Sequence, residues 1–146
     1  MESAKARGEF LAELKLPAER EFIPPAKRVG ACLGSQLGFS IEEIDELGIA
    51  IAQACDSTIE ACEEIWGDGS GATMKLSYAR TERGIAVDVE ATAPSGEALA
   101  RRHARRDPEM QRLAQEMIRF FVNDFQQSVD AGRGRVHLRM VKYLIG

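Results

Sequence analysis

Four arginines are concentrated in one short stretch of the chain, where they could bind oxyanions. Arg101, Arg102, Arg105 and Arg106 lie close together and flank His103. Guanidinium groups make bidentate contacts with oxyanions, so the stretch could hold phosphate, a nucleic-acid backbone or an acidic protein. Because no aromatic residue interleaves the arginines, a protein carboxylate cluster is the preferred ligand over DNA. We favour the simpler alternative of a solvated surface loop, since short charge runs are common on protein surfaces.

The histidines, serines and cysteines indicate no further chemistry. Neither His103 nor His137 has a Cys, Asp or Glu at metal-ligand spacing, so we expect no metal site. Ser57 and Ser95 lack a motif that would activate a hydroxyl, so hydrolase chemistry is not expected. The cysteines form no CxxC pair and lie in apolar helical patterns, which is typical of small buried side chains in a reducing compartment. They are Cys32, Cys55 and Cys62.

Length and composition predict one globular domain over residues 9–146, preceded by a flexible N-terminus at residues 1–8. The 146 residues are 45% hydrophobic and 29% charged, and a chain of this length can build a core without disulfides or metals. The 19 basic and 23 acidic residues give a net charge of −4, which provides no global basic field for nucleic acid or anionic lipid. No apolar run approaches the roughly 20 residues of a membrane span, and the N-terminus lacks a signal-peptide core. We therefore expect a cytoplasmic protein.

Hydrophobic periodicity predicts the elements that must position any site in the first half of the chain. Residues 9–16 alternate in character and are expected to form a half-buried strand. A helix is expected over residues 19–38, and Ser40 with Glu43 forms a capping box that opens a central helix over residues 41–62. The inward side chains of the first strand are expected to be Phe10, Ala12, Leu14 and Leu16.

The second half of the chain is expected to complete an α+β fold. Antiparallel strands are predicted at 74–79 and 85–90, followed by a helix that begins at Pro108 and a last hairpin formed by 127–130 and 135–144. The order β-α-α-β-β-α-β-β indicates about three helices on one face of a mixed, mostly antiparallel sheet. The helix carries a wide apolar stripe that we expect in the core, although its breadth could include a surface for pairing with another chain. The stripe comprises Met110, Leu113, Met117, Phe120, Phe121, Val122 and Phe125.

Four stretches of the sequence, taken with this order of elements, resemble a known family. They are Leu16-Pro17-Ala18, Gly38-Phe39-Ser40 leading into Glu42-Glu43-Ile44, residues 49–55, and Val141-Lys142-Tyr143-Leu144. The chain resembles the anti-sigma serine kinases of bacterial partner-switching systems, which share the ATP-binding fold of histidine kinases, Hsp90 and MutL. The resemblance runs over roughly the whole chain and implies a Bergerat-type ATPase sandwich.

The residues that carry the family's catalytic chemistry are not matched. The resemblance implies a general-base glutamate on the central helix and, one turn later, an asparagine that ligates Mg²⁺, but these positions hold Gln53 and Ser57. An amide cannot accept a proton at neutral pH, and a hydroxyl is a poorer magnesium ligand than an amide oxygen. Asp56 could offer a carboxylate, but it lies about 100° around the helix from Ser57. A solvated helix acid is therefore the preferred interpretation of Asp56.

The glycine-rich nucleotide boxes that the resemblance implies are also missing. The family has Asp-x-Gly-x-Gly after the strand that ends here near Val89, where its aspartate binds the adenine amino group. Ala91 and Ala93 stand in this degenerate box, and no glycine lies between Gly96 and Gly132, where a second box should precede the third helix. The sequence therefore predicts a kinase-like scaffold without nucleotide chemistry.

The preferred hypothesis is a regulatory protein-binding module that is similar to an anti-sigma factor and needs neither ATP nor metal. The resemblance implies a sigma factor, a STAS-type antagonist or another switch component as the partner, and it makes a homodimer plausible. Lys27 and Arg28 lie in a region resembling the family's contact surface, although ordinary helix surface explains them equally well. The arginine stretch, which resembles the family's ATP lid, is a second candidate surface.

Two alternatives stay open. The first is an active serine kinase that uses ATP and Mg²⁺ to phosphorylate a STAS-type anti-anti-sigma factor, with the arginines replacing the lost phosphate cradle. The second is a nucleic-acid-associated protein that uses the same arginines, whose binding would weaken steeply with salt.

Overall fold

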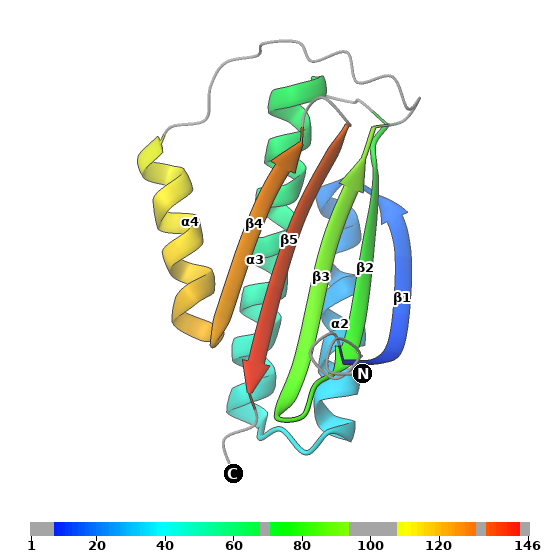
Figure 1. The fold of residues 1–146 in the computed structure, drawn as a ribbon, viewed down its shortest axis with the longest axis vertical. Coiled ribbons are helices and arrows are strands. Elements are labelled where there is room, and N and C mark those ends of the chain that lie inside the picture. The colour runs from blue at the N-terminus through cyan, green and yellow to red at the C-terminus, as the bar shows by residue number, and fades with distance from the viewer. Residues whose placement is uncertain (1–7, 68–70, 94–107, 131–133, 144–146) are drawn as a thin grey trace.

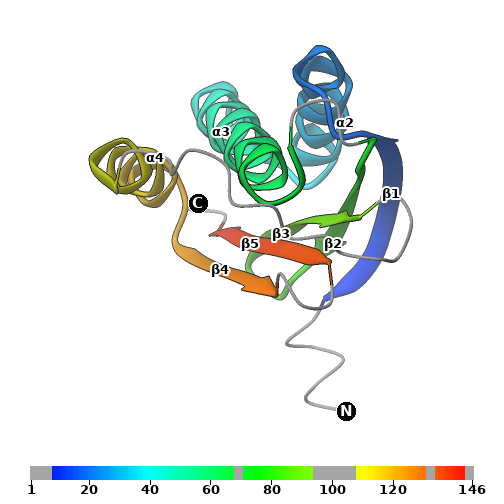
Figure 2. The same ribbon diagram turned by 90° about the horizontal axis from the view of Figure 1, so that it is seen from above.

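The computed structural model describes residues 8–67, 71–93, 108–130 and 134–143, which form one sheet with helices on one of its faces (Figures 1 and 2). The α+β class and the order of the elements are confirmed. The elements are β1 (Glu9–Pro17), the short 3₁₀ helix η1 (Arg20–Phe22), α2 (Ile23–Gln36), α3 (Ile41–Trp66), β2 (Thr73–Arg80), β3 (Gly84–Thr92), α4 (Pro108–Phe121), β4 (Asp124–Asp130) and β5 (Arg135–Tyr143).

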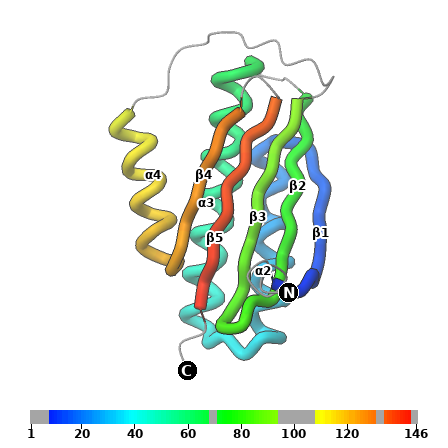
Figure 3. Tube along the Cα trace, viewed as in Figure 1, coloured from blue at the N-terminus to red at the C-terminus, as the bar shows by residue number. Residues whose placement is uncertain are grey.

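The sheet has the strand order β1-β2-β3-β5-β4. Its pairings are all antiparallel, so the mostly antiparallel sheet that the sequence predicts contains no parallel pair among its described strands. The chain leaves β3, passes through α4 and the edge strand β4, and returns as β5 between β3 and β4 (Figure 3). This topology places α4 at the β4 end of the row of helices, with α3 between α4 and α2 (Figure 2).

The first strand departs from the predicted alternation at one end. Phe10 is 71% exposed, whereas Leu11 packs against the core. The register between β1 and β2 shifts between Phe10 and Ala12, and such a bulge turns a side chain to the opposite face of the sheet. The prediction that Phe10 points inward is therefore wrong, while Leu14 and Leu16 pack against the core as predicted.

The helix predicted over residues 19–38 forms as η1 followed by α2. Pro24 and Pro25 occupy its first turn, where a missing N–H costs no hydrogen bond. The helix stops at Gln36, and Gly38 has a φ of +92°, a conformation that favours glycine just beyond a helix end.

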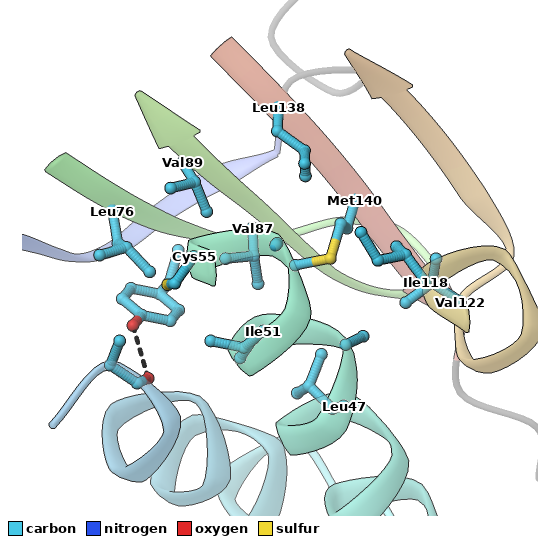
Figure 4. Packing of buried hydrophobic residues seen from close by; sticks show 14 of the residues in the cluster. Leu47, Ile51, Cys55, Leu76, Val87, Val89, Ile118, Val122, Leu138 and Met140 are labelled. Carbon is cyan, nitrogen blue, oxygen red and sulfur yellow. Dashed lines mark hydrogen bonds between the residues drawn. The ribbon is translucent and has the colours of Figure 1, made fainter. Parts of the chain in front are cut away.

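The central helix α3 begins at the predicted capping box. Ser40 Oγ accepts a hydrogen bond from the Glu43 backbone N–H at 3.1 Å, and Glu43 Oε1 accepts one from the Ser40 N–H at 2.9 Å. Its inner face packs on β3 and β5, as Figure 4 shows for Leu47, Ile51 and Cys55. No described helix combines the length and apolar character that crossing a membrane requires.

A buried hydrogen bond joins α2 to strand β2 of the sheet, beside the packing of α3 on β3 and β5. The Tyr78 hydroxyl of β2 donates to the Ala26 carbonyl oxygen at 2.7 Å, and both residues are fully buried (Figure 4). Burial, with a smaller effect from nearby Cys55, raises the pKa of Tyr78 well above its ordinary value. Tyr78 therefore stays neutral and acts as a structural donor.

Candidate functional site

The two positions that the resemblance assigns to catalysis lie next to each other on α3. Gln53 is half-buried and Ser57, one turn later, is buried with 6% of its surface exposed. The Gln53 Nε2 donates a long hydrogen bond of 3.4 Å to Ser57 Oγ. Neither an amide nor a hydroxyl accepts a proton at neutral pH, so this pair cannot act as a general base.

A groove between α3 and α4 lies beside this pair, and we call it the α3/α4 groove. Its volume is about 540 Å³. The side chains that line it come from two sources: an apolar wall on α4 and a polar wall on α3. Among the described lining residues the charged groups are all carboxylates. The lining comprises Gln53, Asp56 and Glu60 of α3, with Met110, Leu113, Ala114, Glu116, Met117, Phe120 and Phe121 of α4.

Asp56 is held in an ion pair, which differs from the predicted solvated acid. Arg20 of η1 donates from Nε to Asp56 Oδ1 at 2.7 Å and from its two Nη atoms to the Glu63 carboxylate at 3.0 and 3.1 Å. These bonds, the one to Glu63 foremost, raise the pKa of Arg20 above its ordinary value. Sequence reasoning missed Arg20, because it precedes its partners by 36 and 43 residues and no local spacing links them.

The apolar stripe predicted for the third helix divides between core and surface, so the expectation that it lies in the core holds for part of it. The helix ends at Phe121, so Val122 and Phe125 lie beyond it, and both are buried. Within α4 the fully buried residue is Ile118. Four other large apolar residues of α4 line the α3/α4 groove and remain exposed there. They are Met110 at 63%, Leu113 at 58%, Met117 at 47% and Phe120 at 80% exposure.

The residues that the sequence analysis assigned to a degenerate nucleotide box take part in packing and strand pairing. Ala91 is fully buried in a small cluster with Ala61, Cys62 and Val136, and it pairs with Val136 across β3 and β5. The Ala93 backbone N–H donates to the Gly134 carbonyl oxygen at 3.0 Å. The end of β3 is therefore occupied by core and ladder contacts of the sheet.

The candidate partner-binding residues lie apart from the groove. Lys27 and Arg28 are exposed on α2, and the Lys27 side chain runs over Gly48 of α3. Because α3 stands between α2 and α4, these two residues and the α3/α4 groove occupy different sides of the helical layer (Figure 2). Other residues considered from the sequence lie outside the described residues. They are Ser95, Arg101, Arg102, His103, Arg105 and Arg106.

The second histidine contacts Asp88, which also binds Arg139, on the sheet face opposite the helices. His137 Nε2 lies 2.8 Å from Asp88 Oδ1, and Arg139 Nη1 donates to Asp88 Oδ2 at 2.7 Å. Asp88 faces this side because its neighbours Val87 and Val89 are buried under the helices. Within the described ranges, no group of three or more His, Cys, Asp or Glu side chains is arranged to hold a metal ion.

Comparison with known proteins gives one partial similarity. No protein-family model matches the chain. A stretch of 66 residues is 27% identical to the serine-protein kinase RsbW of Halalkalibacterium halodurans, which corresponds to 45% of this chain and 38% of that protein. The alignment thus spans less than half of either protein. The similarity agrees with the resemblance found in the sequence and supports a distant relationship between this chain and the anti-sigma factor kinases.

Proposed function

We propose that this chain is a regulatory protein-binding module similar to an anti-sigma factor, which sequesters a sigma factor or another partner-switch component without using nucleotide. The distant relationship to a serine-protein kinase supports the scaffold and the class of partner. Holding a partner on a preformed surface requires the fold but none of the groups that transfer phosphate.

The hydrogen bond between Gln53 and Ser57 is the observation that carries this proposal. The resemblance implies a general base and a magnesium ligand at these two positions, and an amide bonded to a hydroxyl there supports a role without phosphate transfer. The charged groups in the described lining of the α3/α4 groove are carboxylates, and that lining contains no Lys or Arg to attract a triphosphate. Asp56 is paired with Arg20, and the remaining carboxylates of the described lining repel the like charges of a triphosphate, which supports the proposal.

We propose that the partner contacts the exposed Lys27 and Arg28 on α2. An ammonium and a guanidinium on one exposed helix can bind carboxylates of an acidic segment. The arginines at 101–106 are a second proposed contact.

The first test is titration calorimetry of the chain with ATP and with ADP, with and without Mg²⁺, at millimolar nucleotide. We expect no heat of binding and no thermal stabilisation. Micromolar binding would overturn the loss of nucleotide chemistry. The active serine kinase would then become the leading function, to be tested by transfer of labelled phosphate to STAS-domain proteins of the source organism.

The second test measures affinity for sigma factors and STAS-domain proteins of the same organism by calorimetry. The double variant Gln53→Ala/Ser57→Ala is expected to bind as the parent chain does, because the pair lies away from α2. The variant Lys27→Glu/Arg28→Glu is expected to bind at least about tenfold more weakly. Arg83→Glu, a charge reversal in the exposed β2–β3 turn, is the matched control. If no partner binds the parent chain, or if Gln53→Ala/Ser57→Ala alone abolishes binding, the proposal is wrong.

A further inference from the structure

We propose that the α3/α4 groove binds a basic amphipathic helix of a protein partner. The helix lays its apolar face on α4 and places a Lys or Arg side chain beside the carboxylates of the groove. This site and the pair Lys27 and Arg28 lie on different sides of the helical layer (Figure 2). The inference therefore goes beyond the proposed function and does not depend on it.

The wall of the groove on α4 exposes a contiguous apolar surface. Met110, Leu113, Met117 and Phe120 all line the groove, and they are between 47% and 80% exposed. Isolated exposed apolar side chains are common in proteins, but a contiguous patch marks an interaction surface or a binding groove. Two of the four are methionines, whose flexible side chains adapt to the shape of a partner. The α4 wall is therefore suited to an apolar face of another protein.

The length and spacing of this wall fit a helix. The lining from Met110 to Phe121 extends about 16 Å along α4, which is about three helical turns. The four exposed side chains recur at intervals of three, four and three residues, the spacing found along a seam between packed helices. A helix that lies in a groove presents its apolar anchors at the same spacing. Small-molecule sites bury most of their ligand, whereas this wall is open, and this difference favours an extended partner.

The charges of the described lining favour a positively charged partner. They are carboxylates on both walls, Asp56 and Glu60 on α3 and Glu116 on α4. Asp56 is paired with Arg20, so Glu116, which is exposed on α4, is the carboxylate that we expect a cation of the partner to contact. The two arginines of α4 lie outside the lining. An acidic helix would meet like charge in the groove, whereas a basic helix meets opposite charge.

Fluorescence anisotropy with a labelled synthetic peptide tests the site on the full chain. The probe is a capped peptide of Leu and Lys, four turns long, in which Leu recurs at intervals of three and four residues to give one apolar face. One control peptide has the same composition in an order without an apolar face, and the other has Glu in place of Lys. The probe is expected to bind with micromolar affinity and to gain helical circular dichroism. Each control peptide is expected to bind at least about tenfold more weakly.

Variants of the chain test whether the peptide lies in the groove. Leu113→Ser removes an apolar anchor without changing the net charge, and it is expected to weaken binding of the probe at least about tenfold. Glu116→Lys is expected to weaken binding of the probe several-fold and to strengthen binding of the Leu and Glu peptide. A loss of folding could not produce this exchange of preference.

Matched control variants lie outside the lining of the groove. Ile41 is 80% exposed at the start of α3, and Glu82 is exposed in the β2–β3 turn. Ile41→Ser and Glu82→Lys are therefore expected to bind the probe as the parent chain does, and circular dichroism verifies that every variant is folded. Absence of binding to the parent chain, equal binding of the three peptides, or full affinity in Leu113→Ser overturns the proposal.

Discussion

Lys142 is a buried cation that ties the C-terminal end of α4 to the sheet. Its side chain is 6% exposed, and its Nζ donates to the Phe121 carbonyl oxygen at 2.9 Å while lying 3.6 Å from Glu46 Oε1. A hydrogen bond from a charged donor contributes about 1.5–3 kcal/mol, and a cation at a helix C-terminus adds about 0.3–1 kcal/mol. Replacing Lys142 also removes the free-energy cost of burying its ammonium group away from water, and this gain offsets part of the lost interaction energy. Lys142→Met is therefore expected to lower the free energy of unfolding by about 2 kcal/mol.

Urea unfolding followed by circular dichroism measures this loss. With a slope of about 2 kcal/mol per molar urea, the midpoint should fall by about 1 M. Lys75→Met is the matched control on β2, where the lysine is 36% exposed and 3.9 Å from Glu13, and it should change stability by less than about 0.5 kcal/mol. If Lys142→Met is neutral or stabilising while Lys75→Met is neutral, the buried ammonium gives no net stabilisation and the reasoning fails.

Two further predictions concern a glycine and the thiols. Gly84→Ala is expected to lower the free energy of unfolding in urea by at least about 3 kcal/mol, because a Cβ there would lie 1.9 Å from a carbonyl oxygen of β5. Gly48→Ala is the control and should be tolerated, since a Cβ there meets only the end of a lysine side chain at 3.5 Å. Equal stability of the two variants would contradict this prediction. An alkylating reagent should label Cys32 in the folded chain and spare the buried Cys55 and Cys62, whose pKa values burial raises to about 12. The ordinary pKa of a thiol is 9.0, so the unfolded chain releases these protons before the folded chain does. The contribution of the two thiols to stability should therefore be constant below about pH 9 and be lost between about pH 9 and 12. A flat alkaline profile of stability would contradict the burial of the thiols.

The order of the elements could be predicted because local patterns specify it. The capping box of Ser40 and Glu43 uses groups three residues apart, and the helix start at Pro108 depends on a residue that needs no N–H partner. The placement of Gln53 and Ser57 together on one helix follows from the helical repeat alone. These features require no knowledge of what packs against the helix.

Features that depend on distant partners could not be predicted. The ion pairs of Arg20 with Asp56 and Glu63 join segments 36 and 43 residues apart, and the bulge that exposes Phe10 arises from the register between two strands. The stripe on α4 shows the same limit, because periodicity predicts an apolar face without specifying what covers it.

The sequence by itself determined the α+β elements, their order and the absence of a glutamate–asparagine pair at Gln53 and Ser57. Only the tertiary structure decided that Phe120 is exposed at the α3/α4 groove while Ile118 is buried, and that Lys142 is enclosed beside Phe121. The physical reason is that helix and strand repeats are set by neighbouring residues, whereas burial is set by which surfaces the topology brings together.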